Sequence, residues 1–268
     1  MKNPTLHFLS VCLLSFFLFS ACKQKASKKT AAAKTPVILV HSAWLGAWQW
    51  EATIESLENE SLTLIAPDLL GHGQDSTPPG DITMDDYVNQ LLEIIDKQTE
   101  QVVLVGHSFN GITISRVAEL RPKKVKKLIY VTAFLVPNGT SFYSAVQGVE
   151  NSKAVEHFYL SDDQSYALVN ESEMHNAFAH DIPLETFNAA KPYIVPEPAQ
   201  PLDYALEISE ENFGQIPKYY IECTQDKAIP IEVQRAMYGG KVKKHYSLES
   251  SIPQIFPNPI PWPIWSKK

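Results

Sequence analysis

Strand-like and helix-like segments alternate along most of the chain. Short runs of apolar, often β-branched residues are typical of strands buried on both faces of a parallel sheet. These runs are residues 37–40, 62–65, 102–105, 127–134, 217–223 and 243–248. Residues 83–98 instead place apolar side chains at helical spacing, and Thr83 with Asp86 is typical of a capping box. The alternation predicts an α/β fold with a mostly parallel sheet, right-handed crossovers and flanking helices.

The pattern loosens between about residues 141 and 206. Short helical stretches alternate there with polar runs and prolines. An insertion at the carboxyl ends of sheet strands would lie over a ligand site, so we expect a helical lid. His157, His175 and His180 fall inside this segment, and we expect them to be surface or lid residues rather than catalysts.

The N-terminus has the pattern of a targeting signal. Residues 1–22 start with a positive charge, continue with the apolar run 8–19 and end with small residues before Cys22. This arrangement resembles a bacterial lipoprotein signal, in which Cys22 becomes the lipidated first residue. It predicts a lipid-anchored protein of the cell envelope that meets a membrane through the anchor. The alternative is an ordinary secretory signal cut near Ala21, which predicts a periplasmic or secreted protein.

Composition favours one globular domain and excludes some partners. The 268 residues are 44% hydrophobic, and we assign the domain to residues 36–251. Residues 23–35 are expected to be a solvated tether, and residues 252–268 are an atypical Pro-rich tail. The formal net charge of −7 argues against a nucleic-acid partner. The few cysteines form no disulfide framework and no metal-ligand spacing occurs, so we expect neither a metal nor a cofactor.

The strand at residues 102–105 leads into a tight turn that carries Ser108. Residues 106–110 read Gly-His-Ser-Phe-Asn, which matches the G-x-S-x-G nucleophile elbow except at Asn110. Asparagine tolerates positive φ better than most residues, so we expect the elbow to form. The helix expected at 112–120 would offer N–H groups to a developing negative charge. The alternative is a serine that only N-caps a buried helix.

Two other loops follow strands and carry groups that such a serine would need. Residues 41–50 follow the first strand, where a backbone N–H can complete an oxyanion hole. Asp226 comes after the strand at 217–223 and fits the chain order Ser…Asp…His. The alternative is that Asp226 caps the helix at 231–238. His72 is flanked by glycines, and we expect it to hold its loop rather than to act as a base.

Together, five stretches resemble the hydroxynitrile lyase and plant methylesterase branch of the α/β-hydrolase superfamily, including its bacterial esterase-like members. They are residues 41–50, 66–73, 106–111, 130–140 and 219–230. The resemblance implies an α/β-hydrolase fold, with Ser108 as the nucleophile and Asp226 as the triad acid. It also implies that the backbone N–H groups of Ala43 and Phe109 form the oxyanion hole. The implied reaction is hydrolysis of a small carboxylic ester through an acyl-enzyme.

The chain departs from this family where the catalytic histidine is expected, directly after the last strand. Residues 248–254 read Leu-Glu-Ser-Ser-Ile-Pro-Gln, and no histidine follows His245, which lies within the strand. The prolines of the tail are also incompatible with the closing helix of the family. The sequence therefore predicts an impaired serine hydrolase. The alternatives are a non-catalytic ligand-binding module on the same fold and a hydroxynitrile-lyase-like enzyme, which the hydroxyl of Ser42 favours.

The resemblance stops within a residue or two of Ser251. Gradual divergence would keep the apolar period of a helix while identities change. With permitted codons, one nucleotide added before Ile252 converts Ile-Pro-Gln into His-Ser-Pro, and the prolines that follow can be lost. This reading places a histidine directly after Ser251. We therefore interpret residues 252–268 as a stretch read out of frame.

Overall fold

A six-stranded sheet with the order β2-β1-β3-β4-β8-β9 forms the centre of the fold. The computed structural model describes residues 34–57 and 61–251. The strands are β1 (Thr35–Val40), β2 (Leu62–Ile65), β3 (Val102–His107), β4 (Val125–Val131), β8 (Lys218–Cys223) and β9 (Lys244–Leu248). Each neighbouring pair is parallel, which confirms the predicted parallel sheet.

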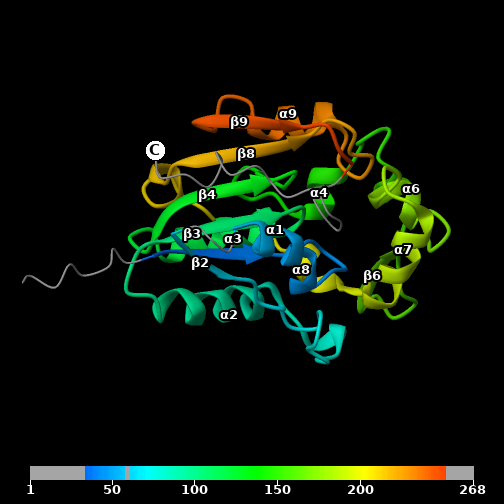
Figure 1. Cartoon of the computed structure of the whole chain (residues 1–268), viewed down its shortest axis with the longest axis horizontal. Helices are drawn as coiled ribbons and strands as arrows, with labels where there is room; N and C mark the ends of the chain where they lie inside the picture. The colour runs from blue at the N-terminus through cyan, green and yellow to red at the C-terminus, as the bar shows by residue number, and fades with distance from the viewer. Residues whose placement is uncertain (1–33, 58–60, 252–268) are drawn as a thin grey trace, which may run out of the picture. The chain divides into compact units, whose positions relative to one another are not determined.

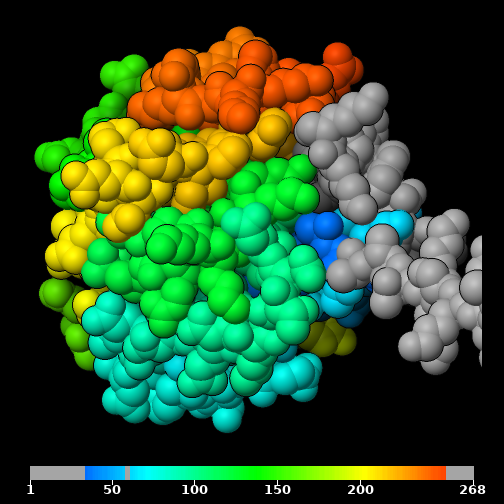
Figure 2. All heavy atoms as spheres, turned by 90° about the vertical axis from the view of Figure 1, so that its left-hand side faces the viewer, coloured from blue at the N-terminus to red at the C-terminus, as the bar shows by residue number. Residues whose placement is uncertain are grey.

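Helices join the strands, as parallel pairing requires. They are η1 (Ala47–Trp50), α1 (Glu51–Leu57), η2 (Pro79–Asp81), α2 (Met84–Asp96), α3 (Asn110–Leu120), η4 (Phe213–Gln215) and α9 (Ile231–Tyr238). The predicted capping box is present at the start of α2, because Thr83 and Asp86 each accept from the other's backbone N–H. In Figure 2 the colours cross the face in bands from cyan through green and yellow to orange, so segments lie largely in chain order across this face.

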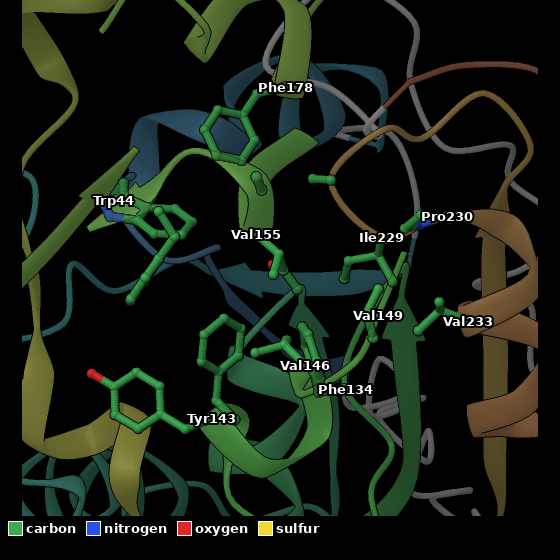
Figure 3. A pocket seen from close by; sticks show the side chains of 15 residues that line it. Trp44, Phe134, Tyr143, Val146, Val149, Val155, Phe178, Ile229, Pro230 and Val233 are labelled. Atoms are coloured by element: carbon green, nitrogen blue, oxygen red, sulfur yellow. The ribbon is translucent and has the colours of Figure 1, made fainter. Parts of the chain in front are cut away.

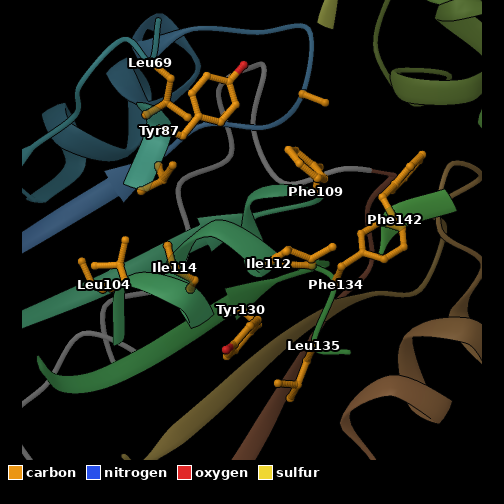
Figure 4. Packing of buried hydrophobic residues seen from close by; sticks show 14 of the residues in the cluster. Leu69, Tyr87, Leu104, Phe109, Ile112, Ile114, Tyr130, Phe134, Leu135 and Phe142 are labelled. Carbon is orange, nitrogen blue, oxygen red and sulfur yellow. The ribbon is translucent and has the colours of Figure 1, made fainter. Parts of the chain in front are cut away.

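Alternate side chains of the central strands enter two separate cores. On β1, Ile38 and Val40 belong to the larger core, which also holds the buried residues of α2 and α3. Figure 4 shows Tyr87 of α2 and Ile112 of α3 in this core. Val37 and Leu39 belong to the second core, together with Trp50 from η1. Burial on both faces explains why β1 and β3 contain continuous apolar runs.

The segment 141–206, which we call the lid, is only partly helical. It contains α4 (Phe142–Val146), α5 (Lys153–Glu156), β5 (Phe158–Leu160), β6 (Tyr166–Val169), α6 (Met174–Phe178), α7 (Leu184–Ala190), η3 (Lys191–Tyr193), β7 (Glu197–Pro198) and α8 (Ala199–Asp203). The strands β5, β6 and β7 form an antiparallel sheet, so the prediction of a helical lid was incomplete. Figure 1 places β6, α6 and α7 at the end of the central sheet toward which β8 points.

Several sequence predictions lie outside the described residues. They concern the signal segment with Cys22, most of the tether, and the expectation that the tail 252–268 forms no closing helix. Within residues 34–57 and 61–251, no helix has the length and apolar character needed to cross a membrane.

Candidate active site

Ser108 occupies the turn between β3 and α3 in a left-handed conformation. Its φ is +52°, a value that costs most non-glycine residues about 1–2 kcal/mol. The strand and helix around it nearly touch. A Cβ on Gly106 would lie 2.8 Å from the carbonyl oxygen of Asn110, and one on Gly111 would lie 2.6 Å from that of Phe134. This strained, close-packed turn is the geometry of a nucleophile elbow.

Asn110 has a different role from the one predicted. It lies within α3, and the positive φ falls on Ser108 instead. Its buried amide donates to the carbonyl oxygen of His41 at 2.7 Å and accepts from the Thr113 hydroxyl at 2.6 Å. Asn110 therefore links the elbow to the loop after β1 by a side-chain hydrogen bond that a glycine could not make.

The hydroxyl of Ser108 does not cap the helix. The N-cap residue of α3 is Phe109, without a side-chain cap. The alternative interpretation of Ser108 as a helix cap is therefore wrong. Ser108 instead lines a pocket beneath the lid.

The pocket is apolar and encloses about 630 Å³, including the space at its mouth. The lid contributes Phe142, Phe158 and Phe178, and the central domain contributes Trp44, Phe134 and Ile229. Figure 3 shows these aromatic and aliphatic side chains converging from the two sides. Among its described lining residues, only Ser108, Tyr143 and Trp44 carry a polar side-chain atom. Such a lining suits a ligand whose bulk is apolar.

Ala43 and Phe109 carry the backbone N–H groups that were predicted as oxyanion donors. Phe109 directly follows the serine, and Ala43 lies in the loop that Asn110 ties to the elbow. Neither N–H donates a hydrogen bond to another described residue. Buried unpaired N–H groups are rare, and both residues are almost fully buried. Two buried donors without an acceptor in the described residues are therefore a feature of this site.

The loop around Ala43 is held by a chain of buried side chains. The Ser42 N–H donates to Oε1 of Gln49 at 2.8 Å, and the Ser42 hydroxyl donates to the Ala43 carbonyl at 3.0 Å. The amide nitrogen of Gln49 contacts Nδ1 of His107. Burial lowers the pKa of His107 to about 3, so its ring is neutral and accepts this bond. Ser42, Gln49 and the elbow are thereby connected.

Asp226 is buried at the carboxyl end of β8. Its Oδ1 accepts the N–H groups of Ala228 and Ile229 at 2.7 and 2.9 Å, and its Oδ2 accepts the Thr132 hydroxyl at 2.6 Å. The N-cap of α9 is Pro230, so the alternative of Asp226 as the cap of that helix is wrong. Burial raises the pKa of Asp226 to about 7, against the three hydrogen bonds that lower it. A carboxyl group with so perturbed a pKa is typical of a functional site.

None of the described histidines makes a hydrogen bond to Ser108 or Asp226. His72 uses its two ring nitrogens on the Leu70 carbonyl and on Glu197, so it holds its loop as predicted. His245 lies in β9, and its ring stacks on Tyr238 with 5.1 Å between centroids.

The other described histidines either contact groups outside the Ser108 site or do not line the pocket. His41 is fully buried, where burial lowers its pKa well below the usual value, and both ring nitrogens have backbone partners. In the lid, His175 bonds the Ile182 carbonyl and His157 lies beside two glutamates. The lid residue His180 has a buried Nδ1 without a partner, but it does not line the pocket.

Three residues of the site were missed by sequence reasoning. Gln49 and Thr132 have no motif of their own, and Glu197 lies in the Pro-rich part of the lid. Glu197 is fully buried and binds the Trp44 N–H from 153 residues away. In the sequence, Glu197 is recognisable only as a glutamate between two prolines, and this pattern does not indicate that it binds Trp44.

An elbow serine on a parallel sheet, a lid above it and an aspartate after a later strand define a protein of the α/β-hydrolase class. The sequence profile of the alpha/beta hydrolase family matches residues 37–253. The chain therefore belongs to this family, as its resemblance implied.

The relatives agree with the predicted branch. The chain is 32% identical to putative methylesterase 15 of Arabidopsis thaliana over 75% of its length, and 29% identical to that plant's alpha-hydroxynitrile lyase over 79%. It spans 48% of the first protein and 87% of the second, and about half the length of three of the chloroplastic methylesterases it matches. The solved structure of a pyrethroid hydrolase from Sphingobium faniae superposes with a TM-score of 0.73 at 29% identity, covering 81% of this chain and 90% of that one. These relatives support an enzyme of the hydrolase type with esterase-like chemistry.

Proposed function

We propose that the chain is a serine hydrolase of small, largely apolar carboxylic esters that is impaired because its triad histidine is missing. The observation that carries the proposal is Ser108, held at positive φ on the elbow and lining an apolar pocket. In the reaction, the Ser108 oxygen attacks the ester carbonyl, the bond to the alkoxy group breaks, and the alcohol leaves with the serine proton. Water then hydrolyses the acyl-enzyme to the acid and free Ser108. Asp226 is the triad acid.

The N–H groups of Ala43 and Phe109 are the proposed oxyanion hole. They belong to two loops that Asn110 connects through its hydrogen bond to the His41 carbonyl. One such donor contributes a factor of about 10²–10³ to turnover. This contribution does not require a base, so some catalysis remains in a chain without the histidine.

Replacing Ser108 tests the nucleophile. Without a base, the serine stays a neutral hydroxyl, so we expect slow turnover of a chromogenic ester by the unchanged chain. Ser108→Ala should lower this residual rate by about tenfold or more and abolish labelling by a fluorophosphonate. Ser172→Ala, at an exposed lid serine, is the matched control and should change neither. Equal rates for the unchanged chain and Ser108→Ala would contradict the proposal.

A non-catalytic binding module is the second candidate. The hydrogen bonds of Asp226 to Thr132, Ala228 and Ile229 favour it, because no described histidine shares them. A binding module would take up apolar ligands in the pocket but leave fluorophosphonate unreacted. The strained backbone of Ser108 favours the enzyme, since a binding pocket has no need of that strain.

A lyase of the hydroxynitrile type is less favoured. Such an enzyme would use a hydroxyl facing the substrate, whereas Ser42 donates its hydroxyl to the Ala43 carbonyl and does not line the pocket. Release of hydrogen cyanide from a cyanohydrin, measured beside ester hydrolysis, separates the two activities.

We also infer a lipid anchor on Cys22, from the signal-like pattern of residues 1–22. Two or three acyl chains would anchor firmly, where one chain binds marginally. Cys22→Ala should therefore move the protein from the membrane fraction to the soluble fraction of its bacterial host and remove palmitate label. Cys12→Ala, within the predicted signal, should leave both unchanged. Unaltered fractionation of Cys22→Ala would refute the anchor.

A further inference from the structure

The lid binds every polar group of Trp44, the residue next to the proposed oxyanion donor Ala43. The Trp44 N–H donates to Oε2 of Glu197 at 3.0 Å, and its carbonyl accepts from the Val195 N–H at 2.9 Å. The indole Nε1 donates to the Ala167 carbonyl at 2.9 Å. The ring lies 5.4 Å from that of Phe178, and both face the pocket in Figure 3.

These contacts hold a conformation that tryptophan rarely adopts. Trp44 has a φ of +64°, which costs about 1–2 kcal/mol for a residue with a side chain. Its three hydrogen-bond partners come from residues 167, 195 and 197, all within the lid. A lid that moved away would remove the interactions that stabilise this strained backbone.

Glu197 acts on the peptide that follows Ala43. It binds the N–H of the Ala43–Trp44 peptide, and the Ser42 hydroxyl binds the carbonyl of the same peptide. These two hydrogen bonds fix the plane of the Ala43–Trp44 peptide. The Ala43 N–H belongs to the adjoining Ser42–Ala43 peptide, so the direction of this N–H depends on the orientation of the Ala43–Trp44 plane.

The carboxylate of Glu197 is itself held in a buried network. It is fully buried and contacts Nε2 of His72 at 2.8 Å and the Tyr87 hydroxyl at 3.3 Å. Burying the His72–Glu197 ion pair costs several kcal/mol per ion. Apolar side chains could hold a lid closed without that cost. The network instead supplies a directional acceptor at one backbone N–H.

We propose that Glu197 is a positioning residue for the oxyanion hole, so that docking of the lid and orientation of the Ala43 N–H are one event. This inference rests on the proposed role of Ala43 in catalysis. A substrate that lets the lid close then assembles the hole, and an open lid leaves Ser108 without one of its two donors.

The test compares Glu197→Met, which keeps the volume of the side chain but removes the acceptor of the Trp44 N–H, with Glu171→Met, which removes a lid carboxylate that binds Lys191 at the surface. Fluorophosphonate labelling of Ser108 is measured over a range of probe concentrations, which separates the maximal rate of reaction from the affinity of the pocket. Hydrogen exchange of residues 41–46 is followed by mass spectrometry on the same proteins. For Glu197→Met we expect the maximal rate to fall about tenfold with unchanged affinity, and exchange at 41–46 to speed up. Glu171→Met should alter none of these.

The outcomes separate this inference from the proposed function. Weaker affinity with an unchanged maximal rate would mean that Glu197 only shapes the pocket, and unchanged exchange would mean that it does not order the loop; either result overturns the inference. If the unchanged chain shows no labelling that depends on Ser108, the proposed function is refuted, and the oxyanion role of Glu197 is refuted with it. The exchange data would still decide whether the lid orders residues 41–46. If Glu197→Met does not fold, Glu197→Gln, which offers one acceptor oxygen in place of two, should show the same changes to a smaller extent.

Discussion

Restoring the reading frame after Ser251 should raise ester turnover by about 10²–10⁴-fold, the usual contribution of a general base. The segment after β9 runs beside the loop of Asp226, because the Thr224 N–H donates to the Leu248 carbonyl and the Gln225 N–H to that of Ser250. A histidine directly after Ser251 would enter the site from this segment. It would accept the Ser108 proton, and Asp226 would stabilise the imidazolium.

The measurement compares initial rates of chromogenic ester hydrolysis for the repaired and unrepaired chains. Ser108→Ala in the repaired chain is the control, and it should remove the gain. Sequencing the gene around codon 251 decides whether the codons permit the shift. A repaired protein no faster than the unrepaired one would contradict the frameshift interpretation, and full-speed turnover of the unrepaired chain would identify another base, with His245 as the first suspect.

The centre of the sheet was predictable because strands such as β1 and β3 are buried on both faces. The strand over 62–65 and the helix over 231–238 have the bounds that the apolar pattern predicted. The start of α3 was predicted two residues late, at 112 rather than at Asn110. Hydrophobic periodicity cannot locate the first residue of α3, because residues of the elbow are selected so that strand and helix can approach closely and not for an amphipathic pattern.

The strands of the lid were missed for a physical reason. β5 and β7 have only three and two residues, too few for an alternating pattern to be recognised. β6 alternates, with Ala167 and Val169 buried, but it has only four residues among prolines and polar runs.

The candidate site was predictable only where a motif or the chain order exposed it. Ser108 and Asp226 follow strands at the carboxyl edge, which is where the fold places chemistry. The residues that position the site act over long separations in sequence. Thr132 contacts Asp226 across 94 residues, and Glu197 contacts Trp44 across 153. A single sequence contains no signal for such pairs, because neither partner belongs to a local pattern.

Asp226→Asn should stabilise the protein at neutral and alkaline pH. Burial raises the pKa of Asp226 to about 7 from a usual value of 3.8, so the folded state holds a proton that the unfolded state releases. The neutral acid costs no stability below about pH 4, and the penalty grows as the pH rises and is complete above pH 7. With about 1.4 kcal/mol per pKa unit, the penalty reaches up to about 4 kcal/mol.

Asparagine fits the same hydrogen bonds. Its carbonyl oxygen can accept from Ala228 and Ile229, and its amide can donate to the Thr132 hydroxyl. Urea unfolding of Asp226→Asn at pH 4, 6 and 8 should show a gain in the free energy of unfolding that is near zero at pH 4 and largest at pH 8. Asp162→Asn, at an exposed lid aspartate, should show no such trend. A gain that is constant with pH would mean that Asp226 is not neutral when buried.

The same substitution should act in the opposite direction on catalysis. In a chain with the histidine restored, Asp226→Asn removes the charge that stabilises the imidazolium, and loss of this kind lowers turnover by about 10⁴-fold in serine hydrolases. A residue that destabilises the fold yet is needed for the reaction is selected for chemistry and not for packing. Asp226→Asn should therefore give a more stable and, in the repaired chain, far slower protein. Stability gained without loss of turnover in that chain would remove Asp226 from the triad.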